Sequence, residues 1–183
     1  MGNPAVLTFV TTNAGKLREA ARLLPVPLDG VALELEELQT TDLERLVRHK
    51  TAQAYARLAR PLLVEDTALV FTAWGALPGP FVKHFLRELG TEGLVRALRP
   101  FGDDRAEAVC TAGYHDGETV HLFEGRAKGT IVAPRGARGF GWDPIFQPLG
   151  CDRTFGEMAP AEKQQHSMRA RALEGLRAFL LGD

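Results

Sequence analysis

Short apolar runs alternate with stretches of helical periodicity along the first half of the chain. Residues 5–10, which are apolar except for Thr8, and residues 62–64 form runs that are typical of strands buried on both faces. Residues 31–35 predict a further strand. Residues 16–24 and 42–59 place apolar side chains at helical spacing, and the second of these stretches opens with a capping-box spacing. This half therefore predicts strands and helices in alternation.

The second half has a different pattern. Residues 106–114 and 119–127 predict the two arms of an antiparallel hairpin, joined by His115-Asp116-Gly117-Glu118, and residues 128–132 extend the second arm. Helical spacing returns at 80–89, 91–98 and 160–181. Together the two halves predict an α/β fold with a mixed sheet and two lobes around a cleft.

Composition and charge narrow the class of protein. A length of 183 residues with 45% hydrophobic and 25% charged residues indicates one globular domain, residues 1–183. The formal net charge of −1 creates no overall field that would steer the chain to nucleic acid or to a membrane. Two cysteines form no motif, and no apolar run is long enough to span a bilayer. We therefore expect a cytoplasmic enzyme or binding protein with neither nucleic acid nor membrane as its partner.

The stretch Leu62–Phe71 contains the strongest signal for a site. Its buried apolar run is expected to end at Glu65-Asp66, and charge at the mouth of a core strand costs free energy unless it is paired or bound to a metal. Open α/β sheets place their ligands at such strand ends. The two acids therefore indicate either a site or the start of a solvated turn.

The loop Thr11-Thr12-Asn13-Ala14-Gly15-Lys16 joins the first strand to a helix. A polar loop at a helix start, with a lysine beside it, can bind an anion through backbone N–H groups and hydroxyls. The alternative is an ordinary helix start capped by Asn13. Among 22 basic residues the only lysines are Lys16, Lys50, Lys83, Lys128 and Lys163. These lysines are candidates for phosphate contacts, against the alternative of biased codon usage.

Three further positions along the chain contain candidate ligand-binding residues. In Phe140-Gly141-Trp142-Asp143, two aromatic residues flank a glycine beside an acid, an arrangement that can sandwich a base or form an aromatic corner of the core. Arg169 lies on the expected buried face of the last helix, where an arginine usually meets an anion or a carbonyl. Lys50 falls in the apolar seam of its helix, so its head either reaches solvent or points into a cleft.

Taken together, these segments resemble the inosine triphosphate pyrophosphatase family, the HAM1-like enzymes that act on non-canonical purine nucleoside triphosphates. The resemblance covers nearly the whole chain. It rests on five motifs in the same order: Thr11-Thr12-Asn13 with Lys16, Val64-Glu65-Asp66-Thr67, Leu77-Pro78-Gly79-Pro80 with Lys83, Phe140-Gly141-Trp142-Asp143-Pro144, and Lys163 through Ser167 to Arg169.

The resemblance implies a long twisted mixed β-sheet with flanking helices, in two lobes around a central nucleotide-binding cleft, and a homodimer. It also implies hydrolysis of ITP, dITP and XTP to the monophosphate and pyrophosphate with Mg²⁺, or with Mn²⁺ as a second candidate. Glu37 and Asp66 match the metal ligands, and the catalytic residues are expected to be Asp66, Lys16 and Lys83. The positions that match substrate contacts are Thr11, Thr12, Asn13, Ala14, Gly15, Lys16, Lys50, Asp66, Thr67, Lys83, Phe140, Gly141, Trp142, Asp143, Lys163, Met168 and Arg169.

One position departs from the family pattern. The family usually has Ser-His-Arg where this chain has Ser167-Met168-Arg169, and methionine cannot donate a hydrogen bond to a base edge. Two other functions stay open. A Maf-like nucleotide pyrophosphatase would act on pyrimidine or modified nucleotides, but its Ser-Pro-Arg-Arg loop does not resemble Thr11–Lys16. A catalytically silent nucleotide-binding protein would be signalled by loss of Glu37 or Asp66, and both are present.

Overall fold

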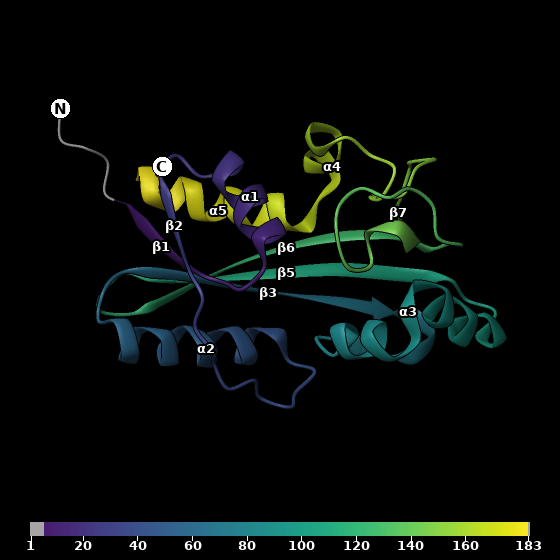
Figure 1. Cartoon of the computed structure of the whole chain (residues 1–183), viewed down its shortest axis with the longest axis horizontal. Coiled ribbons are helices and arrows are strands. Elements are labelled where there is room, and N and C mark those ends of the chain that lie inside the picture. The colour runs from purple at the N-terminus through teal and green to yellow at the C-terminus, as the bar shows by residue number, and fades with distance from the viewer. Residues whose placement is uncertain (1–5, 183) are drawn as a thin grey trace. The chain divides into compact units, whose positions relative to one another are not determined.

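The computed structural model describes residues 6–182 (Figure 1). Its helices are α1 (Ala14–Leu23), α2 (Leu43–Leu58), α3 (Val82–Leu98), α4 (Pro160–His166) and α5 (Met168–Leu181). Its strands are β1 (Leu7–Val10), β2 (Leu28–Val31), β3 (Leu62–Phe71), β4 (Pro78–Gly79), β5 (Arg105–His115), β6 (Val120–Ile131) and β7 (Phe146–Pro148). Short 3₁₀ turns follow β3 and α3 and precede β7.

The strands form one mixed sheet in the order β2-β1-β3-β5-β6-β7, with β4 also paired to β3. β1 runs parallel to both β2 and β3, whereas β4 and β7 are antiparallel to their partners β3 and β6. β5 and β6 are neighbours joined by the turn at 116–119, as the hairpin pattern predicted. The predicted α/β class with a mixed sheet is confirmed.

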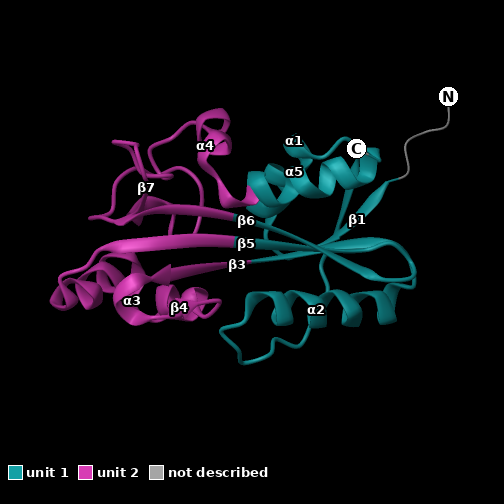
Figure 2. Ribbon diagram, turned by 180° about the vertical axis from the view of Figure 1, so that it is seen from behind, with its two compact units in different colours: residues 1–66, 110–125, 170–183 teal, residues 67–109, 126–169 magenta. Residues whose placement is uncertain are grey.

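The chain divides into two compact units, which Figure 2 colours separately. Unit 1 contains residues 1–66, 110–125 and 170–183, and unit 2 contains residues 67–109 and 126–169. β3, β5 and β6 each contribute residues to both units. Some of the motifs found in the sequence therefore belong to unit 1 and others to unit 2.

In unit 1, α2 covers one face of the sheet while α1 and α5 lie on the other (Figures 1 and 2). Ala54 of α2 packs with Val10, Leu62 and Val64 of the two parallel strands. On the opposite face, Phe179 of α5 lies against aromatic rings of the hairpin: Tyr114, His121 and Phe123. Burial of these apolar surfaces is the main free energy that holds the unit together.

Unit 2 has two aromatic clusters. Trp74 contacts the rings of Phe71, Phe85 and Phe101, which brings α3 onto the end of β3. The second cluster joins the rings of Trp142, Phe146 and Phe155. Within residues 6–182, none of the helices has the length and apolar composition needed to cross a membrane.

Three predicted boundaries were wrong. The second strand is Leu28–Val31 rather than 31–35, because those residues pair with β1. Leu33 and Leu35 lie in an irregular segment after the strand and pack against the core formed by β1, β3 and α2. The predicted helix 160–181 is broken at Ser167, whose extended backbone separates α4 from α5. The helix expected at Pro80 begins at Val82. The predicted division into two helices, 80–89 and 91–98, is confirmed, because Gly90 between them has a non-helical backbone with φ 65°.

The central strand also differs from the prediction. We expected it to end at Glu65-Asp66, but β3 continues to Phe71 with both acids at its middle. Its parallel partner β1 ends opposite Val64, so the acids lie just beyond the end of β1, where the loop 11–16 begins. A strand can carry two adjacent acids at this point because cations from outside the strand neutralise them.

Candidate active site

Glu65 and Asp66 point to opposite faces of β3, as successive strand residues do. The Glu65 side chain is fully buried, and its Oε1 lies 2.7 Å from Lys16 Nζ. The Cys110 thiol of β5 donates a hydrogen bond of 3.1 Å to the other carboxylate oxygen. A buried carboxylate is costly unless it is paired, and here a lysine and a thiol both contact it.

Lys16 reaches Glu65 from the first turn of α1. Asn13 caps this helix, because its side chain accepts hydrogen bonds from the backbone N–H groups of Gly15 (2.8 Å) and Lys16 (3.2 Å). The hydroxyl of Thr11 likewise accepts from the N–H of Asn13. These N–H groups are thus engaged within the loop, and the ammonium of Lys16 is the group that this loop carries toward β3. Thr12 and Ala14 are exposed in the same loop.

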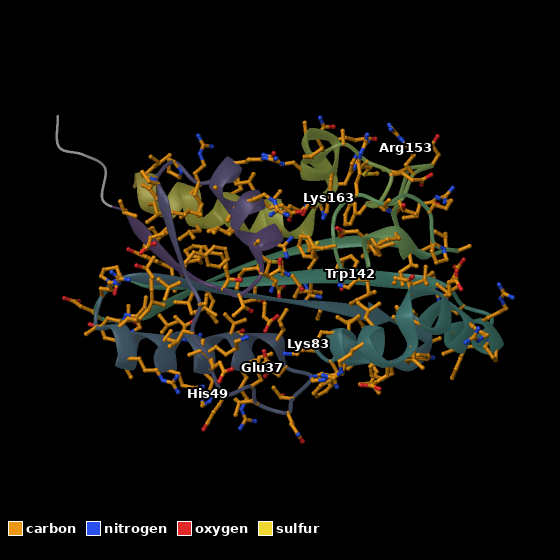
Figure 3. All side chains as sticks on the ribbon, viewed as in Figure 1. Glu37, His49, Lys83, Trp142, Arg153 and Lys163 are labelled. Atoms are coloured by element: carbon orange, nitrogen blue, oxygen red, sulfur yellow. The ribbon has the colours of Figure 1, made fainter. Side chains whose placement is uncertain are left out.

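Asp66 is held from the α2 side. Lys50 Nζ donates to Asp66 Oδ2 at 2.8 Å and to Glu37 Oε1 at 3.1 Å, and Lys16 Nζ lies 3.5 Å from Asp66 Oδ1. Burial of Lys50 disfavours its charged form, but the charges and hydrogen bonds of Asp66 and Glu37 outweigh that effect and raise the pKa of Lys50. Lys50 therefore points into the cluster instead of reaching solvent. Figure 3 labels Glu37 in the segment before α2.

The donor set fits a hard divalent cation. One oxygen of Glu37 and one of Asp66 converge on a single positively charged group, the Lys50 ammonium, so the two carboxylates already share a position that stabilises a cation. Mg²⁺ commonly takes one or two carboxylates and completes its shell with water and phosphate oxygens. Among residues 6–182, no group of three His, Cys, Asp or Glu side chains is arranged to hold a metal ion.

A second polar cluster lies in unit 2. The carboxylate of Asp143 accepts hydrogen bonds from Lys163 Nζ and from the N–H of Phe140, both at 2.7 Å. The ammonium of Lys163 lies 5.0 Å from the centroid of the Phe140 ring and 5.3 Å from that of Phe155. Gly139 has φ +76°, and a Cβ there would clash with the Asp143 carboxylate, so this loop conformation requires glycine.

Arg169 is a fully buried side chain, and its guanidinium lies 5.4 Å from the centroid of the Phe140 ring. Ser167 positions it, because the Ser167 hydroxyl accepts a hydrogen bond from the Arg169 N–H and so caps α5. Met168 between them is buried, with its sulfur 3.9 Å from the same hydroxyl. His166 lies against Cys151 at 3.6 Å.

The remaining predicted residues differ in their position and burial. Trp142 is buried in the ring cluster of Phe146 and Phe155, which is the core arrangement that the sequence left as an alternative. Gly141 is exposed beside it. Thr67 follows Asp66 on β3, and Lys83 is exposed in the first turn of α3, in unit 2. Figure 3 labels Lys83, Trp142 and Lys163.

The structure thus gathers the predicted residues into two groups. Lys16, Glu37, Lys50 and Asp66 share direct contacts in unit 1, and Phe140, Asp143, Lys163 and Arg169 do so in unit 2. Sequence reasoning assigned no role to Glu65, which contacts Lys16, or to Cys110, which donates a hydrogen bond to Glu65. An acid inside an apolar strand was a signal for Glu65, whereas nothing local to Cys110 indicated its contact.

Comparison with known proteins gives a consistent result. The model of the Ham1 family matches residues 7–179. A protein from Scheffersomyces stipitis named inosine triphosphate pyrophosphatase is 43% identical to this chain, over 98% of this chain and 100% of its own length. A protein of the same name from Mycosarcoma maydis is 44% identical, over 100% of this chain and 97% of its own length. The structure of the Staphylococcus aureus Ham1 protein superposes with a TM-score of 0.84 at 26% identity, over 97% of this chain and 99% of that one. The chain belongs to the Ham1 family.

Proposed function

We propose that this nucleoside-triphosphate pyrophosphatase hydrolyses the non-canonical purine nucleotides ITP, dITP and XTP to the monophosphate and pyrophosphate, with Mg²⁺ as its cation. One observation carries the proposal: two lysines from separate helices converge on adjacent acids at the middle of a core strand. Such a cluster suits a polyanionic substrate that arrives with a metal ion. The names of the relatives support the same substrate class.

Charge neutralisation is the main task of the lysines. A triphosphate carries about four negative charges, and a water molecule has to approach phosphorus through them. Lys16, Lys50 and Lys83 supply positive charge toward the phosphates. We assign to Asp66 the role of orienting the attacking water or accepting its proton, because a carboxylate oxygen can accept a hydrogen bond or a proton from water.

Glu37 and Asp66 would hold the divalent cation. The cation, when bound, neutralises phosphate charge and makes the phosphorus easier to attack. The loop 11–16 follows β1, whose last residue pairs with Val64, and Thr67 follows Asp66 directly on β3. These positions support a role for both segments beside Asp66. We assign these residues to the phosphates and the ribose.

The unit 2 cluster suits an oxo-purine. Phe140 offers a ring beside two cations, and Asp143, Lys163 and Arg169 offer polar edges fixed by burial. A 6-oxo group accepts hydrogen bonds, whereas the 6-amino group of adenine donates them, so donors such as Arg169 discriminate between the two. We further infer that residues 1–183 act as one catalytic domain in a cytoplasmic homodimer.

The decisive test is a nucleotide panel. Pyrophosphate release is measured from ITP, dITP, XTP, GTP and ATP, with Mg²⁺ and then with excess chelator. We expect the three non-canonical nucleotides to be cleaved at least about tenfold faster than ATP, since one unsatisfied buried donor costs about 1–3 kcal/mol. Chelation and Asp66→Asn should each remove most of the activity. Equal rates with ATP and ITP would contradict the purine selectivity, and release of orthophosphate instead of pyrophosphate would contradict the reaction.

A further inference from the structure

Lys50 occupies the position on which the proposed metal ligands converge. Its ammonium lies 2.8 Å from Asp66 Oδ2 and 3.1 Å from Glu37 Oε1, and only 12% of its side chain is exposed. The stem leaves α2 on its apolar side, one turn after Leu46 and Val47. The Lys50 ammonium therefore contacts both carboxylates in a region that is largely shielded from solvent.

A divalent cation cannot share these oxygens with the ammonium. Mg²⁺ binds carboxylate oxygens at about 2.1 Å, so it would lie within a few ångströms of an ammonium that contacts the same atoms. Like charges at such a separation repel strongly, and more so where solvent is largely excluded. A metal ion bound to these two oxygens would therefore displace Lys50 from Glu37 and Asp66.

Lys16 is in a different situation. It lies 3.5 Å from Asp66, but its 2.7 Å contact is to the fully buried carboxylate of Glu65, and its Nζ is also 3.4 Å from the Glu65 carbonyl oxygen. Loss of the Asp66 contact would leave Lys16 paired. Lys50, by contrast, is held by the two carboxylates that a metal would claim.

We propose that Lys50 is a resident cation that holds the metal ligands together and makes metal binding depend on the nucleotide. The displaced ammonium needs a new anion, and the triphosphate of the proposed function supplies one. Bound nucleotide consequently raises the affinity for the metal ion, and bound metal raises the affinity for the nucleotide by the same factor. In the absence of nucleotide the enzyme binds divalent cations weakly, because each cation has to displace an ion-paired lysine. The inference rests on the metal ligands assigned in the proposed function.

The test measures Mn²⁺ binding to the enzyme without nucleotide, from the electron paramagnetic resonance signal of the free ion. Lys50→Gln keeps a polar group of similar length that can still donate to either carboxylate, but it removes the charge. We expect this variant to bind Mn²⁺ at least about tenfold more tightly than the wild type, because the metal ion no longer has to displace an ion-paired ammonium. Lys50→Arg, which keeps the charge, should bind as weakly as the wild type.

Lys128→Gln is the matched control, because it removes one positive charge from an exposed position of β6. It should leave Mn²⁺ binding unchanged. Lys50→Met replaces the glutamine variant if circular dichroism shows that the latter does not fold. An unchanged or weaker affinity in the neutral Lys50 variant overturns the proposal, and so does an equal gain in Lys128→Gln. Either result leaves the proposed function standing if the wild type still cleaves ITP with Mg²⁺.

Discussion

Two deeply buried carboxylates in this protein, those of Glu65 and Asp143, each contact a lysine ammonium. Glu65 is paired with Lys16, and Asp143 with Lys163, at 2.7 Å in both cases. Breaking such a pair by removing one member leaves an uncompensated charge and costs more than the pair itself contributes. Substitutions at these positions should therefore be made with neutral groups of similar shape.

Met168 is the residue at which this chain departs from the family pattern. It is buried beside Ser167 and next to Arg169, and its thioether offers no N–H to a nucleobase. We expect Met168→His to raise the ratio of ITP to ATP hydrolysis several-fold, because an imidazole N–H can donate to a 6-oxo group and finds no acceptor in a 6-amino group. The measurement is kcat/KM for both nucleotides.

Met168→Leu is the control for volume, since it exchanges one apolar side chain for another of similar size. It should leave the ITP-to-ATP ratio within about twofold of the wild-type value, as expected for a swap that alters no hydrogen bond. A shift as large as that of the histidine variant would show that packing, and not hydrogen bonding, sets the ratio.

Among the elements, α2 depends on close contact with the sheet. The helix packs over β5 at Gly113, where an added Cβ would collide with the Thr51 hydroxyl oxygen and approach Val47 Cγ1 to 2.9 Å. This close approach fixes the depth of α2, and α2 carries Lys50 toward Asp66. The absence of a side chain at Gly113 is thus a requirement of the packing that places the site.

Gly113→Ala tests that requirement. We expect it to lower the free energy of unfolding by about 1–3 kcal/mol, the usual cost of overpacking, as measured by urea denaturation. Thr51→Ala removes the nearest colliding atom, so the double variant should be less destabilised than the sum of the two single changes. Strictly additive costs would contradict the close approach of α2 to β5.

Across the whole molecule, the two units hold different chemistry. Unit 1 contains the lysine and carboxylate cluster around β3, and unit 2 contains the aromatic and polar cluster around Asp143. Under the proposed function the first group acts on the phosphates that all nucleotides share, and the second acts on the base. Substitutions in the first group should therefore lower the activity toward all nucleotides, whereas substitutions in the second should change the preference among bases.

A pair of substitutions tests this division. Lys16→Met should lower kcat for ITP, XTP and ATP by at least about tenfold each and leave their ranking unchanged, since it removes charge that every triphosphate meets. Asp143→Asn should lower kcat/KM for ITP and XTP far more than for ATP, because it loosens the groups that face the base. If Asp143→Asn slowed all three nucleotides equally, the assignment of the unit 2 cluster to base recognition would be wrong.

Some features were determined by the sequence alone because they depend on neighbouring residues. Helix α2 begins after Asp42, close to the predicted start, although Asp42 caps it through the Arg45 N–H and the predicted box of Thr41 and Glu44 does not. The hairpin of β5 and β6 follows from its turn residues. The five motifs, in their order along the chain, also predicted the family. In each case the prediction depends only on residues that are close together in the sequence.

Tertiary structure alone decided which charges meet. Glu65 pairs with Lys16, 49 residues earlier in the chain, because β1 runs parallel to β3 and delivers the loop 11–16 beside the acids. The same sheet lets β3 continue through two acids that were expected to end it. Partners distant in sequence are set by strand order and register, and no local pattern records either of them.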